Sequence, residues 1–301
     1  MKVLRKLREI YNIVQDLPVR LHLMQESIGR IEARQTRGNF DGNLRSAEFR
    51  VFSQWGEDGI IQAIIETVRP AVRTFIEFGV HDYRESNTRF LLVNNNWSGL
   101  VIDGGQGNVD TIRKDPIYWQ HNLKAECQFI TRDNIDSIFQ RCGISGEIGL
   151  LSIDIDGNDY WVWKALKTVN PAIVIVEYNS RFGADRAVTT PYAPGFVRAE
   201  AHYSHIYCGA SLKAMWLLAR DKGYALVGCN SAGNNAFFVR RDLLVAPLKE
   251  RTVGDAFVAS QYREARNQDG TLAFLSGEDE KRLLSSLSVV DVEDAAQTVD
   301  S

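Results

Sequence analysis

The fold is decided by Arg73-Thr-Phe-Ile-Glu-Phe-Gly-Val80, a short apolar run that ends in an acidic residue and a glycine. Such a run is typical of the first strand of a nucleotide-type α/β fold, in which the glycine lets the backbone turn tightly beneath a ligand. Ser86, Asn87 and Thr88 come next, and each of them can cap the following helix at the end that attracts anions. One such glycine is a weak signal by itself.

The same pattern, an apolar run followed by polar residues, repeats along the chain. Further strands are predicted at 97–103, 127–130, 148–155 and 172–177, and the polar residues that end them are Asp103, Asp133, Asn134, Asp154, Asp156, Glu177 and Asn179. A helix at 211–222 and a hairpin of strands at 224–229 and 235–239 close the series. We therefore predict a Rossmann-like α/β fold with a mostly parallel sheet, an antiparallel last strand and the strand-end acids in one crevice.

An amphipathic helical segment precedes this domain. Its apolar residues follow one another at alternating spacings of four and three, and they are Val3, Leu7, Ile10, Val14, Leu17, Leu21, Met24, Ile28 and Ile31. This is a heptad seam, so we expect a homo-oligomer formed through residues 3–31. Two alternatives stay open: the stripe packs on the chain's own domain, or Pro18 divides the segment into two helices, with Asp16 capping the second.

These patterns divide the chain into three parts. Residues 1–37 form a helical coiled-coil oligomerisation segment, with a linker at 36–43, and residues 45–249 form the α/β domain. Residues 250–301 are polar, with a helix predicted at 278–287 and a flexible tail after it.

The composition limits the kind of partner. A formal charge of −3 gives no general attraction to nucleic acid. The four cysteines lack CxxC spacing, so reduced thiols in a cytoplasmic protein fit better than a zinc site or disulfides. No apolar run reaches the roughly 18 residues of a membrane span. Residues 1–37 hold eight basic and four acidic residues, so we expect at most a peripheral membrane contact.

Four motifs stand in a characteristic order: Ser53-Gln-Trp-Gly-Glu-Asp-Gly59, Phe75-Ile-Glu-Phe-Gly79 with Ser86-Asn-Thr88, Trp97-Ser-Gly-Leu-Val-Ile-Asp103 and Leu151-Ser-Ile-Asp-Ile-Asp-Gly157. From about residue 50 to 180 the chain resembles the FkbM-like family of class I S-adenosylmethionine-dependent methyltransferases. The resemblance implies methyl transfer from S-adenosylmethionine (SAM) to a hydroxyl of a sugar, a polysaccharide or a glycosylated metabolite. It departs from the family where Asp156 replaces the usual Glu and Val80-His-Asp-Tyr replaces a small-residue loop.

The resemblance also implies a set of cofactor-binding residues. Glu77 and Gly79 would lie against the amino-acid part of SAM, and Asp103 would accept hydrogen bonds from the ribose hydroxyls. The other residues expected to bind the cofactor are Asn87, Thr88 and Asp133.

Oxygen ligands for a divalent cation end the fourth and fifth predicted strands. Asp154 and Asp156 are two residues apart, and Glu177 and Asn179 repeat the spacing on the neighbouring strand. The set suits Mg²⁺ and resembles the metal site of catechol-type O-methyltransferases; such an ion would lower the pKa of an acceptor hydroxyl. Hydrogen bonding of these side chains to substrate hydroxyls without a metal stays open as the alternative.

The long connection at 180–209 leaves the fifth strand where an acceptor would sit, so we expect a lid or binding loop. We predict His205, His202 and Asp154 as catalytic residues. Either histidine can act as a general base, because an imidazole titrates near neutral pH. His81 is a further candidate. The arginines of this loop, Arg181, Arg186 and Arg198, would suit a phosphate or carboxylate on the acceptor.

Two other functions compete with methyl transfer. A nicotinamide enzyme is disfavoured because no GxGxxG follows the first strand. A non-catalytic α/β adaptor that oligomerises through its N-terminal coiled coil would leave the strand-end acids without a role.

Overall fold

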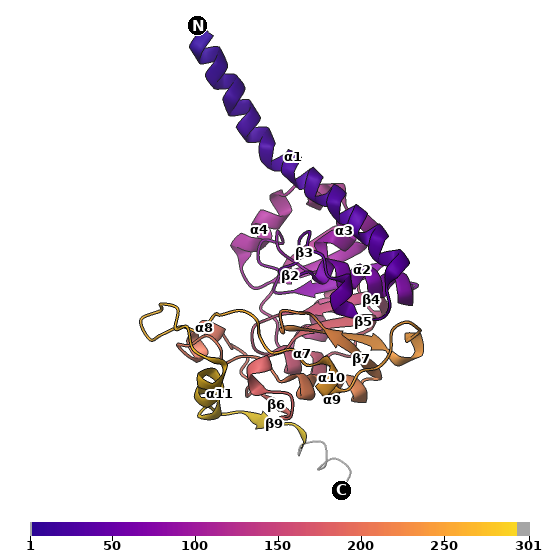
Figure 1. Ribbon diagram of the computed structural model, residues 1–301, viewed down its shortest axis with the longest axis vertical. Coiled ribbons are helices and arrows are strands. Elements are labelled where there is room, and N and C mark those ends of the chain that lie inside the picture. The colour runs from indigo at the N-terminus through magenta and orange to yellow at the C-terminus, as the bar shows by residue number, and fades with distance from the viewer. Residues whose placement is uncertain (1, 294–301) are drawn as a thin grey trace.

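The computed structural model describes residues 2–293 of the chain, without the side chains of residues 2–4 and 9. In this range seven strands form one sheet of order β3-β2-β1-β4-β5-β8-β7. Figure 1 labels β2 to β5 and β7 of this sheet. The seven strands are β1 (Thr74–Phe78), β2 (Ser98–Asp103), β3 (Leu123–Cys127), β4 (Gly146–Ile153), β5 (Val169–Glu177), β7 (Tyr224–Cys229) and β8 (Asn235–Arg240). β1 to β5 pair in parallel, and β8 lies antiparallel between β5 and β7. The predicted fold class is confirmed.

Hydrophobic cores cover both faces of the sheet, because successive side chains of a strand point to opposite sides. Phe75 packs on one face, and Ile76 and Phe78 pack on the other. The first face is covered by α2 (Glu57–Val68), α3 (Arg89–Asn95), α4 (Gln106–Lys114) and α5 (Ile117–Gln120). The second face is covered by α6 (Ile135–Arg141), α7 (Asp159–Ala165), α9 (Leu212–Asp221) and α10 (Val253–Ala256).

The third strand is not where the sequence pattern placed it. A strand was expected at 127–130, whereas β3 runs over Leu123–Cys127 and ends where the prediction begins. β3 is an edge strand in which buried Leu123 and Ala125 alternate with exposed Lys124, so it lacks the continuous apolar run of the central strands.

The C-terminal part of the chain returns across the domain. The helix expected at 278–287 is α11 (Gly277–Ser285), and β9 (Val290–Asp291) pairs antiparallel with β6 (Val188–Thr189). The remaining short elements are η1 (Leu44–Ala47), η2 (Ser180–Phe182), α8 (Arg198–Ala201) and η3 (Arg241–Leu243). The flexible tail predicted at the C-terminal end falls on 294–301, outside the described residues.

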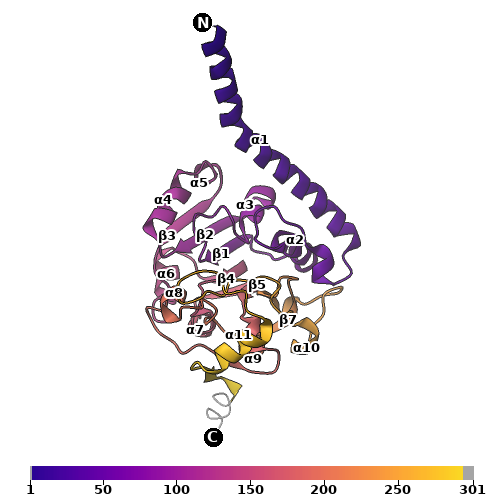
Figure 2. The same ribbon diagram turned by 60° about the vertical axis from the view of Figure 1, so that its left-hand side comes forward.

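The N-terminal segment is one helix, α1 (Lys2–Asn39), which contains Pro18 and whose first half extends away from the domain (Figure 2). The alternative of two helices capped by Asp16 is therefore wrong, and the linker begins after Asn39 instead of at residue 36. None of the described helices is long and apolar enough to cross a membrane. All four cysteines are free.

Candidate active site

Gly79 follows β1 and lies directly against the end of β4. It has a φ of +69°, and a Cβ atom built on it would lie 1.7 Å from the carbonyl oxygen of Asp154. Only glycine allows this backbone conformation and this close approach together. The sequence therefore uses a glycine here to bring two strand ends into contact.

Glu77 is held by the turn that begins α3. Its carboxylate accepts hydrogen bonds from the backbone N–H groups of Asn87 (2.8 Å) and Thr88 (3.1 Å) and from the Thr88 hydroxyl. Burial raises the pKa of Glu77 to about 7. Glu77 thus accepts the N–H groups at this helix end, whereas Asn87 also lines the larger cavity; the role of Asn87 and Thr88 in cofactor binding stays a prediction.

Asp103 ends β2 beside Gly79. It accepts hydrogen bonds from the backbone N–H groups of His81 and Gly105 and from the Asn108 side chain, each at 2.8 Å. An ionised carboxylate has about four acceptor sites, so Asp103 has capacity for about one further donor. That capacity is compatible with a ribose hydroxyl as a donor, and the role of Asp103 in ribose binding stays a prediction.

Two adjoining cavities open at the strand ends. The smaller, of about 160 Å³, is lined by residues at or just after the ends of β1 to β4, including Ile102, Asp103, Gln128, Phe129 and Ile130. The larger, of about 460 Å³, is lined by residues from distant parts of the chain, including Trp55, Glu77, Glu177, Arg198 and Tyr262. Both are lined by Gly79, His81, Asp154 and Asp156, so these four residues form their common wall.

Three of the predicted metal ligands come together. Among the described residues, Asp154, Asp156 and Glu177 each offer a carboxylate oxygen, and these oxygens lie within 4.8 Å of one another. The pKa values of Asp154 and Glu177 lie well above the usual range, because their carboxyl groups are buried and face other acids of this group. The backbone before α7 is fixed by Asp159, which accepts hydrogen bonds from the N–H groups of Ile155 (2.8 Å) and Gly157 (2.9 Å).

The fourth predicted ligand, Asn179, does not join this group. Its carboxamide oxygen accepts a hydrogen bond from the backbone N–H of Arg181, and its amide nitrogen donates to the carbonyl oxygens of Ile206 (2.8 Å) and Cys208 (3.0 Å). The Asn179 side chain therefore holds the loop after β5 in place, and its role as a metal ligand stays a prediction.

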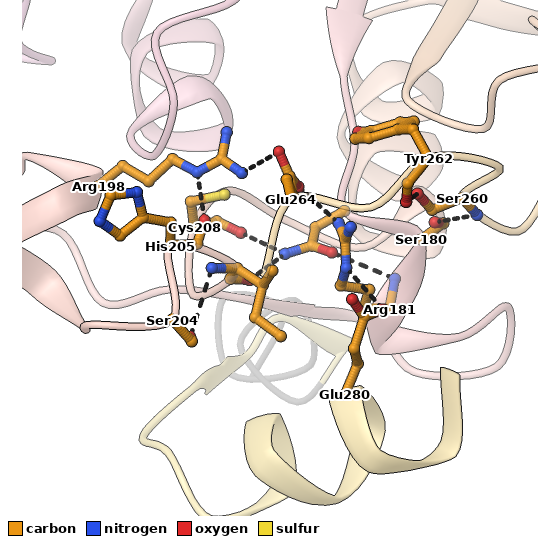
Figure 3. A network of polar contacts seen from close by, with 12 residues as sticks. Ser180, Arg181, Arg198, Ser204, His205, Cys208, Ser260, Tyr262, Glu264 and Glu280 are labelled. Atoms are coloured by element: carbon orange, nitrogen blue, oxygen red, sulfur yellow. Dashed lines mark hydrogen bonds and ion pairs between the residues drawn. The ribbon is translucent and has the colours of Figure 1, made fainter. Parts of the chain in front are cut away.

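Two arginines of that loop are already paired with acids (Figure 3). Arg198 contacts Asp156 at 2.7 Å and also Glu264. Arg181 contacts Glu264 at 2.9 Å and Glu280 of α11 at 3.0 Å. Arg198 lines the larger cavity but already pairs with two acids. The Nη2 atom of Arg181 has no hydrogen-bond partner, but it is buried, and Arg181 is not among the described residues that line either cavity. These positions do not favour the anionic acceptor expected for these two arginines.

The two histidines predicted as general bases lie elsewhere. His202 shares a hydrogen bond with the Ser204 hydroxyl at 2.7 Å, and His205 offers its backbone carbonyl to Arg198. Both are described residues, and neither lines the two cavities. His81 lines both cavities, so it replaces them as the histidine of the site.

Asp133 is also not brought to the site. Its carboxylate accepts a hydrogen bond from the Tyr192 hydroxyl at 2.8 Å, and its side chain is 67% exposed. Asp133 is not among the described residues that line the smaller cavity. The prediction of Asp133 as a cofactor ligand is not supported by this position.

The sequence patterns missed an aromatic wall of the larger cavity. Trp55 and Tyr262 stack with ring centroids 5.3 Å apart and an angle of 20° between their planes. Glu57 is buried; it accepts hydrogen bonds from the Trp55 backbone N–H and from the Asn235 side chain, both at 2.9 Å. The motif at 53–59 contains Trp55 and Glu57, but the sequence alone gave these two residues no role. Nothing in the polar sequence around Tyr262 indicated that it belongs to the site.

No model of a known protein family and no curated protein matches the chain. Three solved structures illustrate what it is similar to. A SAM-dependent methyltransferase from Clostridium acetobutylicum ATCC 824 is 10% identical, over 61% of this chain and 89% of that one, with a TM-score of 0.39. An O-methyltransferase from Bacillus cereus in complex with SAH is 13% identical over 70% and 88%, with a TM-score of 0.40. PKMT2 from Rickettsia typhi in complex with AdoHcy is 9% identical over 68% and 56%, with a TM-score of 0.43. Likenesses of this size concern the fold at most.

Proposed function

We propose that this chain is a SAM-dependent methyltransferase that methylates a hydroxyl group of a sugar, a polysaccharide or a glycosylated metabolite. One observation carries the proposal. Asp154, Asp156 and Glu177 form a three-carboxylate group in the wall of the larger cavity, and the two aspartates also line the smaller one. A donor in one cavity and an acceptor in the other would meet at these acids.

The smaller cavity has the residues that a nucleoside requires. Ile102, Phe129 and Ile130 offer apolar surface for a base. Asp103 keeps capacity for about one more hydrogen bond, which a ribose hydroxyl would donate. The positive sulfonium of SAM would then lie toward the three acids, whose charge attracts it.

The acceptor hydroxyl must lose a proton during methyl transfer. A carboxylate of ordinary pKa is a weak base at neutral pH, and proton transfer is most effective when the pKa of the base lies near the working pH. Because burial and neighbouring acids raise the pKa values of Asp154 and Glu177, either group is a better proton acceptor than an exposed carboxylate. When no ion is bound we assign the base to Asp154, and His81 in the same wall would carry the proton onward.

A divalent cation such as Mg²⁺ fits the same group. Its preferred ligands are carboxylate oxygens, and three of them converge here. Arg198 is the cation that pairs with Asp156, and it is shared with Glu264, so the negative charge of Asp154 and Glu177 is left without such a partner among the described ion pairs. When bound, the ion would supply Lewis acidity that lowers the pKa of the acceptor hydroxyl. Asp154, Asp156 and Glu177 would hold it.

The lining of the larger cavity favours a neutral polyhydroxylated acceptor. Acidic side chains there outnumber the two arginines, Arg198 and Arg263, and the guanidinium of Arg198 is already paired. A phosphate or carboxylate on the acceptor would therefore meet repulsion. Trp55 stacks on Tyr262 and is itself 38% exposed, so its outer ring face offers a flat apolar surface on which a sugar ring can rest.

Cofactor binding is the first test. S-adenosylhomocysteine at 100 times its dissociation constant should raise the free energy of unfolding by about 2.7 kcal/mol, and NADH should not. Asp103→Asn should weaken this binding, whereas the exposed acid Asp133, changed to Asn, serves as the matched control and should leave it unchanged. If the midpoint of thermal unfolding does not move with S-adenosylhomocysteine, methyl transfer is excluded and the adaptor hypothesis gains. Transfer of labelled methyl groups from SAM to neutral rather than phosphorylated glycans then tests the acceptor class.

A further inference from the structure

The helix α1 docks on the domain with the face opposite to its apolar stripe. The ring of His22 lies 5.1 Å from the ring of Phe52. Gly29 packs so closely that a Cβ atom on it would lie 2.4 Å from Val51. These contacts use polar and small residues of the helix. The alternative in which the apolar stripe packs on the chain's own domain is therefore wrong.

The stripe itself stays exposed along the whole helix. Its described side chains are between 47% and 60% exposed, and they are Leu7, Ile10, Val14, Leu17, Leu21, Met24, Ile28 and Ile31. A soluble helix normally buries such a stripe. These residues occupy the a positions (7, 14, 21, 28) and d positions (10, 17, 24, 31) of consecutive heptads, a pattern that packs knobs into holes against a helix of the same repeat.

We propose that two copies of this chain pair through this seam as a parallel coiled coil. A second α1 is the occupant that has the same repeat over the same length, about 37 Å for residues 7–31. The docked face centres on residues 22, 29 and 33, which lie on the far side of the helix from positions a and d; Gln25, at an e position, also donates to the Val51 carbonyl of the domain. The two domains would therefore sit on the outside of the pair.

The charges beside the seam select the parallel orientation. In a parallel pair the g position of one helix faces the following e position of the other, and Arg20 would face the partner's Gln25 while Lys6 would face the partner's Tyr11. In an antiparallel pair with the same layers, Arg20 would face the partner's Arg20 and Lys6 the partner's Arg34. Like charges at these positions are unfavourable, so only the parallel pair avoids repulsion.

The mass of the full-length protein in solution tests the pairing. Light scattering after size-exclusion chromatography should give twice the 33.9 kDa of one chain. The double variant Leu21→Glu, Ile28→Glu should elute as a single chain. The matched control Val19→Glu, Leu23→Glu changes side chains that are 62% and 54% exposed but lie off the seam, and it should keep the mass of the parent. Urea unfolding of both variants should match that of the parent domain, which shows that the domain remains folded.

A cysteine at a d position tests the orientation. Leu17→Cys should form a disulfide between two chains under mild oxidation, because residue 17 faces its own copy in a parallel pair. In the antiparallel pair it would face Leu21 instead, and no such bond would form. The parent, with its four native cysteines, is the control. Four outcomes would each overturn the proposal. The parent could have the mass of one chain or of three chains, the two double variants could have equal masses, or a single-chain protein could bind to anionic vesicles.

Discussion

Changing Gly79 to alanine should disrupt the site and the fold together. The left-handed backbone at this residue costs a non-glycine residue about 1–2 kcal/mol. The added Cβ would lie 1.7 Å from the carbonyl oxygen of Asp154, so the ends of β1 and β4 must also separate. Forced overpacking of this kind costs about 1–3 kcal/mol, which gives a total loss of about 2–5 kcal/mol in the free energy of unfolding.

Gly223 is the matched control for this substitution. It has a φ of +85°, similar to that of Gly79, but a Cβ atom there would meet nothing within 4 Å. Gly223→Ala should therefore cost only the backbone contribution of about 1–2 kcal/mol. Urea unfolding with linear extrapolation measures both values. Calorimetric titration with S-adenosylhomocysteine should show at least a tenfold loss of affinity for Gly79→Ala alone. Equal destabilisation by the two substitutions, or unchanged affinity of Gly79→Ala, would refute the role given to this contact.

Two further outcomes are expected from the buried acids. EDTA should abolish methyl transfer, and Mg²⁺ should restore it. Asp154→Asn should lower the rate of methyl transfer about 100-fold, whereas the exposed control Asp133→Asn should leave the rate unchanged. Full activity of the Asp154→Asn variant would contradict both the metal site and the assignment of the base. Stability should fall as the pH rises from 5 to 7.5, because burial raises the pKa of Glu77 to about 7 and those of Asp58 and Asp159 to about 6. A carboxyl with a raised pKa stabilises the folded state fully below its ordinary pKa and loses this contribution as the pH rises through the raised value. Each group changes the free energy of unfolding by at most about 1.4 kcal/mol per pH unit. Urea unfolding measures this change, and a free energy of unfolding that rises over this range would contradict the prediction.

The sheet was predictable because its central strands are buried on both faces. β4 and β5 read as continuous apolar runs that end in acids, and this signal needs only a short stretch of sequence. β3 lies at the edge, and its alternating exposure gave no such run, so the prediction was displaced toward the apolar residues after it. The strands at the centre of the sheet are therefore those that a continuous run of apolar residues reveals.

The candidate site was predictable only where a residue sits on a strand end. Asp154, Asp156 and Glu177 converge because parallel strands end at one edge of the sheet. His205 and Asn179 lie in the loop after β5, where the direction of a side chain depends on the contacts of the whole loop, and no spacing rule gives it. Tyr262 reaches Trp55 from more than two hundred residues further along the chain. No local pattern can signal such a contact.

The charges around the site explain why the C-terminal segment belongs to it. Acids and guanidiniums alternate from Glu280 through Arg181, Glu264 and Arg198 to Asp156, so this chain of ion pairs carries one net negative charge when all members are ionised. The segment that holds Glu264 thus fixes Arg198 against one acid of the group and leaves Asp154 and Glu177 without a basic partner in the described ion pairs. Two buried carboxyls that repel each other are costly to stability, and natural sequences keep such strain where function uses it. A positive group that enters the cavity, such as a sulfonium or a divalent cation, would relieve that repulsion at the point where the two cavities meet.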